Sequence, residues 1–153
     1  MSHVLQKQLN EREAFRRFVE NLQQSADWGE VASRPEPEPD LLCIHVHRGP
    51  VAFELVSLVD PEIAKVFAAG PKARIEAFLT SDSSERIVRK KLEKTYTTNA
   101  PGIELLVYTD GRTILPDDGI IPTLMPLFGA HSHPFKRIWF MGEHQTCQLW
   151  GDA

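Results

Sequence analysis

The chain has 153 residues, of which 42% are hydrophobic and 25% are charged, a composition typical of one globular domain with a substantial core. The formal net charge of −4 excludes a global basic field for nucleic acid, so any such site must be a local basic patch. No apolar run approaches the roughly 20 residues of a membrane span. The two cysteines, Cys43 and Cys147, lie far apart, which favours reduced thiols in a cytoplasmic protein.

Residues 3–25 carry apolar side chains at helical spacing and predict an amphipathic helix. Glu11 and Glu13 fall between its two apolar groups. Residues 26–30 leave the helix, with Trp28 as an anchor over the core. Residues 34–39 (RPEPEP) contain three prolines, which exclude a helix and favour an extended lead-in to a strand.

Residues 40–59 predict a β-hairpin with a carboxylate on each strand. Asp40 opens the first strand, residues 48–50 make the turn, and Glu54 lies in the middle of the second strand. A glutamate in such an apolar run is costly to bury without a partner, so something must hold its charge. Because Asp40 lies further from the turn than Glu54, we expect a bulge or a splay of the strands to bring both carboxylates to one end of the sheet.

Beyond the hairpin, Asp60-Pro61 predicts a helix start, and residues 72–80 fit either a short helix or a loop and strand. Residues 85–97 predict a helix with a basic stretch, and residues 103–109 a fully buried strand. Three prolines within residues 112–128 predict a short strand or loop, followed by a segment that covers the sheet. The last two predicted strands are residues 137–141 and 146–150.

This order of elements predicts an α/β or α+β fold with a central mixed β-sheet flanked by helices, in a single domain. Within the domain we distinguish an N-terminal helix and lead-in (1–33), a core (34–110) and C-terminal strands with covering loops (111–153). The aromatic residues Trp139, Phe140 and Trp150 fit the core better than a subunit interface, and a homodimer remains an open expectation.

The carboxylates of Asp40 and Glu54, with the carbonyl oxygen of Leu55, would make an oxygen-rich site suited to Mg²⁺ or Mn²⁺. A metal ion there would polarise a phosphate and activate water for phosphodiester hydrolysis. A nearby lysine would orient that water and stabilise the developing charge. Residues 86–94 (RIVRKKLEK) supply the lysines and are also the local basic patch that could contact DNA.

Pro39-Asp40, followed after a hairpin turn by Glu54-Leu55-Val56, resembles the signature of the PD-(D/E)XK nuclease superfamily. The order of elements over residues 3–110 is also similar to that restriction-endonuclease-like core. The resemblance implies a Mg²⁺-dependent DNA endonuclease with Asp40 and Glu54 as metal ligands and catalytic residues. Val56 departs from the pattern, because it stands where the motif has its lysine.

The resemblance also implies where the other catalytic groups would lie. Some members of the superfamily replace the motif's lysine with one from the following helix, which points here to Lys91 and, next, to Lys94. Some members carry a glutamate on the first helix, which points to Glu13, slightly preferred, or to Glu11.

Three other interpretations stay open. If no lysine replaces the missing one, the domain is catalytically inactive and acts by binding nucleic acid or a protein partner. Glu54 could also be purely structural, paired with a buried arginine or lysine. Finally, His45 and His47 on one strand, with His131 and His133 in a loop, could bind zinc or another transition metal. No further ligand at a diagnostic spacing supports that site, and an exposed sheet face is the simpler role for His45 and His47.

Overall fold

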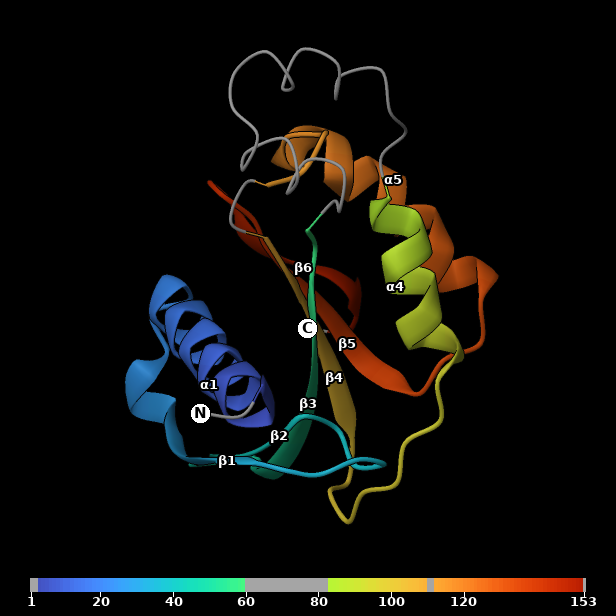
Figure 1. Ribbon diagram of the computed structural model, residues 1–153. Coiled ribbons are helices and arrows are strands. Elements are labelled where there is room, and N and C mark those ends of the chain that lie inside the picture. Colours follow the sequence, from blue (N-terminus) through green and yellow to red (C-terminus); the bar gives the residue numbers. More distant parts are fainter. Residues whose placement is uncertain (1–2, 60–82, 110–111, 153) are drawn as a thin grey trace.

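Figure 1 shows the computed structural model of the chain, which describes residues 3–59, 83–109 and 112–152. Its elements are α1 (His3–Asn21), a short 3-10 helix η1 (Ser25–Asp27), β1 (Trp28–Ser33), β2 (Leu41–His45), β3 (Gly49–Ser57), α4 (Ser84–Glu93), β4 (Ile103–Tyr108), α5 (Asp117–Ala130), β5 (Phe135–Met141) and β6 (Thr146–Gly151). The elements expected at Asp60 and over residues 72–80 lie outside the described residues. Among the helices of these three stretches, none has both the length and the apolar character needed to cross a membrane.

The six strands of the described chain form one mixed sheet, in which neighbours in space follow their order in sequence. β1, β2 and β3 pair antiparallel, β3, β4 and β5 pair parallel, and β6 returns antiparallel to β5. Parallel neighbours need a crossover connection, and α4 and α5 lie on the two crossovers. Figure 1 shows α1 on one side of the sheet and α4 and α5 on the other. The α/β class with a central mixed sheet flanked by helices is confirmed.

α1 covers one face of the sheet with a cluster of aromatic rings. The ring centroids of Phe15 and Phe18 lie 4.9 Å and 6.2 Å from that of Phe53 on β3. Trp28 packs 5.3 Å from Phe15, and Trp139 packs 5.3 Å from Phe18. Each such edge-to-face pair adds about 0.5–1.5 kcal/mol to the burial of its rings. Trp28 is the expected anchor over the core, although it begins a strand, β1, that the sequence pattern did not indicate.

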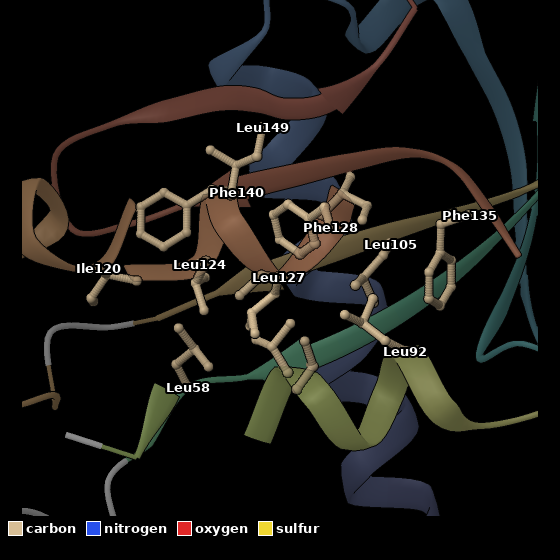
Figure 2. Close-up of a cluster of buried hydrophobic side chains, with 14 of the residues drawn as sticks. Leu58, Leu92, Leu105, Ile120, Leu124, Leu127, Phe128, Phe135, Phe140 and Leu149 are labelled. Carbon is tan, nitrogen blue, oxygen red and sulfur yellow. The ribbon is translucent and has the colours of Figure 1, made fainter. Parts of the chain in front are cut away.

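The opposite face is a larger, mainly aliphatic core beneath α4 and α5 (Figure 2). Leu58 directly follows β3, and Leu105 lies on β4. Leu92 comes from α4 and Leu124 from α5, and all four are buried. Val56 belongs to the same cluster, with 5% of its surface exposed. The position where the nuclease motif carries a lysine therefore packs within an apolar core.

α5 differs from the sequence prediction, which was a short strand or loop followed by a segment that covers the sheet, over residues 112–128. The element is a helix, although Pro122 and Pro126 lie inside it. A proline inside a helix costs about 3 kcal/mol or more. Tertiary packing offsets that cost, because each fully buried aliphatic or aromatic side chain contributes about 1.5–3 kcal/mol. The buried apolar residues of this helix are Ile120, Leu124, Leu127 and Phe128.

The first residue of α5 ties the helix to the turn between β5 and β6. Asp117 Oδ1 accepts the backbone N–H of Glu143 at 3.0 Å. Its Oδ2 accepts those of His144 and Gln145 at 2.7 Å and 2.9 Å. Asp117 is only 5% exposed, so these charge-assisted bonds are shielded from water.

Replacing Asp117 tests this connection. We expect Asp117→Ala to lower the free energy of unfolding by about 3 kcal/mol, because three backbone donors lose their partner. Asp118→Ala is the matched control, since Asp118 is exposed and contacts the same turn only through the Gln145 side chain. The control should change stability by less than about 0.5 kcal/mol in a urea titration. Similar losses in both variants would show that the Asp117 bonds are not what holds the turn.

Candidate active site

The β2–β3 hairpin places Asp40 and Glu54 next to each other at the end of their ladder. The ladder runs without a register shift as far as Leu41, which lies opposite Phe53. Asp40 and Glu54 are the next positions in that register, so the bulge or splay expected from the sequence is not needed. The chain turns just before Gly49, whose φ of 75° is a left-handed conformation that glycine adopts without steric cost. The turn is therefore earlier than predicted, and this shift aligns the two carboxylates.

Two main-chain hydrogen bonds hold these carboxylates. The Asp40 N–H donates to Glu54 Oε1 at 3.1 Å, and the Leu55 N–H donates to Asp40 Oδ2 at 2.9 Å. Each side chain therefore accepts a bond from the main chain of the opposite strand. Glu54 is 1% exposed, whereas Asp40 is half-buried. The main chain of Leu55 consequently lies against Asp40. The carbonyl oxygen of Leu55 was the third ligand expected for the metal site.

α4 brings two lysines to the same carboxylate. Lys91 Nζ lies 3.0 Å from Glu54 Oε2, and Lys94 Nζ lies 3.8 Å from the same oxygen. Both ammonium groups are partly shielded, with 23% and 33% of the side chains exposed. The structure therefore places lysines from the helix beside Glu54, while Val56 stays in the core.

Tyr96 is a neighbour of the site that sequence reasoning did not single out. Its hydroxyl donates to the Lys91 carbonyl oxygen at 3.3 Å, and its ring lies 5.4 Å from the Lys94 ammonium. Burial and the negative charge of Glu54 raise the pKa of Tyr96, so its hydroxyl stays protonated. Lys94 also lies 3.4 Å from Glu36 in the proline-rich lead-in. In the sequence, Tyr96 is marked only by its position two residues after Lys94, and that position is too general to indicate a functional residue.

The first helix contributes Glu11 to the cluster and not Glu13. Glu11 is 5% exposed and shares a hydrogen bond with the Asp40 side chain. Glu13 is exposed and bonded to Arg16, with one contact of 2.9 Å. The slight preference for Glu13 is not supported, because Glu13 lies on the solvent side of α1.

Glu11, Asp40 and Glu54 form a group of carboxyls that repel one another and are removed from water. Burial is the largest cause that raises the pKa of each group above its ordinary value. The charge of Asp40 raises the pKa of Glu54 further, and Lys91 lowers it. The charge of Glu11 likewise raises the pKa of Asp40, and the charge of Glu54 raises that of Glu11. The cluster therefore retains protons that isolated carboxyls would lose, and a cation could take their place.

The residues of the alternative metal site have local roles. His45 Nδ1 accepts the backbone N–H of His47 at 3.1 Å, and His47 lies in the turn after β2, so the two do not share a strand face. The His133 ring packs 4.5 Å from that of Trp150. Both cysteines are free, and burial raises the pKa of each thiol, which disfavours the reactive thiolate. Within residues 3–59, 83–109 and 112–152, no group of three or more His, Cys, Asp or Glu side chains is already arranged to hold a metal ion.

No protein-family model matches the chain, and neither a curated protein nor a solved structure matches it. The likeness to the PD-(D/E)XK superfamily therefore rests on the motif and on the order of elements.

The raised carboxyl pKa values make stability fall as the pH rises. Above the ordinary glutamate value of 4.5, the folded protein binds more protons than the unfolded chain, so deprotonation favours unfolding. Glu11→Gln removes one of the repelling charges. We expect it to raise the free energy of unfolding by about 0.5–2 kcal/mol near pH 8. The gain should disappear near about pH 4, where the carboxyl is protonated in both states.

Glu13→Gln is the matched control for this urea titration. Its hydrogen bonds with Arg16 lower the pKa of Glu13, so removing its charge should give no gain at high pH. If Glu11→Gln stabilised the protein equally at both pH values, charge repulsion would not be the cause.

Proposed function

We propose that this protein is a divalent-metal-dependent phosphodiester hydrolase of the PD-(D/E)XK type, acting on DNA. The observation that carries the proposal is the convergence of Glu11, Asp40, Glu54 and Lys91 from three separate parts of the chain. Two buried carboxyls and a half-buried one close together destabilise a fold, and such perturbed groups concentrate at functional sites. A cytoplasmic location and a homodimer are further parts of this proposal.

The carboxyl cluster fits a hard cation such as Mg²⁺ or Mn²⁺, which prefers oxygen ligands. Asp40 and Glu54 would hold the ion together with the Leu55 carbonyl oxygen, and the ion would compete with protons for these carboxyls. Burial and mutual repulsion, which raise the pKa of these groups, are the costs that a dication would relieve. When bound, the ion would supply Lewis-acid polarisation of the phosphate and a more acidic water.

The chain's own residues would position the reactants. Lys91 would orient the attacking water and stabilise charge that develops on the phosphate, since its ammonium lies 3.0 Å from Glu54. Lys94, 3.8 Å from the same oxygen, is the second candidate for this role. Glu11 would be the outer acid, and its raised pKa suits it to hold or release a proton more readily than an exposed carboxyl would.

A catalytically inactive domain is the second candidate, and one contact favours it. The ion pair between Lys91 and Glu54 could be purely structural, because a buried glutamate needs such a partner whether or not it binds metal. Such a domain would act by binding nucleic acid or a protein. Metal binding separates the two candidates.

Calorimetric titration with MgCl₂ and MnCl₂ is the direct test. We expect saturable binding by the wild type and none by Asp40→Ala. Glu13→Ala, which removes an exposed carboxylate of the same helix as Glu11, should bind like the wild type. Because raised carboxyl pKa values make protons compete with the ion, the affinity should be higher at about pH 8 than at about pH 5, and any proton release should make the heat depend on the buffer. Absence of saturable binding by the wild type at either pH would favour the inactive domain.

Cleavage of labelled DNA tests the lysine. Lys91→Ala should lower the hydrolysis rate by about 10²–10³-fold, because it removes a group that stabilises transition-state charge. It should still bind metal, and Glu54→Ala should abolish cleavage. Lys90→Ala is the control, since Lys90 is adjacent on α4 but exposed. Circular dichroism establishes that each variant is folded; a folded Lys91→Ala protein that cleaves at the wild-type rate would exclude this role for Lys91.

A further inference from the structure

A hollow of about 330 Å³ lies between α1 and β1, the strand at one edge of the described sheet. We call it the α1–β1 hollow. Phe15 and Val19 line it from α1, and Trp28 and Val31 line it from β1. The rings of Phe15 and Trp28 meet edge to face, with their centroids 5.3 Å apart. Such walls favour the apolar part of a ligand, because contact removes apolar surface from water. The volume is at the lower end of the range for small-molecule sites, about 300–1,000 Å³.

The two ends of the α1–β1 hollow differ in charge. It follows one face of α1 from Arg12 to Glu20, a stretch of about 12 Å of helix. At one end, Arg12 Nη1 donates to the hydroxyl of Ser33, the last residue of β1. At the other end, Ser25 lines the hollow just before β1 begins. A guanidinium group therefore marks one end of the hollow and a carboxylate the other.

Arg12 is a half-buried cation whose hydrogen-bond partner is a neutral hydroxyl. In the part of the chain that the structure describes, no carboxylate lies within ion-pair distance of its guanidinium group. Ser33 takes one N–H of the planar fork, which carries further donors. A guanidinium group of this kind beside apolar walls favours a carboxylate ligand, which accepts two of its N–H groups at once.

The other charges around the hollow compensate one another. Arg16 is paired with both Glu13 and Glu20, so it is not counted as available to a ligand. The charge of Arg17 also lowers the pKa of Glu13. These two arginines offset the two glutamates, and Arg12 is the surplus charge.

We propose that the α1–β1 hollow binds an amphipathic monocarboxylate, a small molecule with an apolar body and one carboxylate at its end. The carboxylate pairs with Arg12, and the apolar body lies along Phe15, Val19 and Trp28. Glu20 repels a second carboxylate at the far end, which restricts the ligand to one acid group. The inference is independent of the proposed metal-dependent function, because none of the residues that line the hollow belongs to the carboxyl cluster.

Titration of the isotope-labelled protein with octanoate, followed by NMR of the backbone amides, tests this site. The titration is done at about pH 7, where the carboxyl group of the probe is ionised. We expect saturable shifts of the amide signals of residues 12–20 and 28–31. Two other probes each keep half of the ligand: 1-octanol keeps the apolar body, and acetate keeps the carboxylate. Each should bind about 10-fold more weakly than octanoate, or weaker still.

Arg12→Gln should weaken octanoate binding by about 10-fold or more and leave 1-octanol binding unchanged, because glutamine keeps a donor for Ser33 and lacks the charge. Arg17→Gln is the matched control, since it removes the same charge from an exposed position of α1 that does not line the hollow. It should bind octanoate within about twofold of the wild type. The amide spectrum of each variant shows that it is folded. Absence of saturable shifts, shifts that lie outside the hollow, equal affinities for octanoate and 1-octanol, or equal losses in the two variants would each overturn the inference.

Discussion

The burial of Glu54 in the middle of a sheet is the constraint on which the rest of the site depends. With 1% of its surface exposed, this carboxylate cannot be solvated and must find partners inside the protein. One oxygen accepts the Asp40 N–H, and the other faces Lys91. These two contacts connect the β2–β3 hairpin to α4. The need to compensate the buried charge of Glu54 therefore fixes α4 against the hairpin and brings Lys91 close to the carboxyls.

A second buried glutamate shows what a purely structural solution looks like. Glu104 on β4 is 2% exposed and accepts bonds from Arg48, Arg137 and Trp139. Two guanidinium groups and an indole N–H surround this one carboxylate, so its negative charge is fully compensated. Glu54 instead shares its surroundings with two other carboxyls, and Lys91 and Lys94 lie 3.0 Å and 3.8 Å from the same oxygen. This grouping of several carboxyls with raised pKa values distinguishes the surroundings of Glu54 from those of Glu104.

Local patterns predicted much of the fold, and they failed where tertiary packing outweighed them. The hairpin, α4 and β4 have clear periodicities and appeared close to the expected positions, although the hairpin turn is earlier than residues 48–50 and α4 ends at Glu93. α5 did not, because two prolines argue against a helix unless a sheet buries one of its faces. On α1, the apolar Val4 and Leu9 are 64% and 44% exposed, and the buried face lies further along at Phe15 and Phe18. Because the buried face of α1 does not follow all the apolar positions, the sequence did not show whether Glu11 or Glu13 faces the sheet.

By itself, the sequence determined the chemical groups and their local order: a carboxylate on each strand of a hairpin, a valine where a lysine was expected, and lysines on the following helix. Only the tertiary structure decided which of these groups meet. Glu11 and Glu13 are two residues apart on a helix of 3.6 residues per turn, so they point in nearly opposite directions and only one can face the sheet. The choice depends on which side of α1 packs against Phe53. Likewise, Lys91 reaches Glu54 because α4 packs on the same face of the sheet, a contact between residues 37 positions apart that no local pattern encodes.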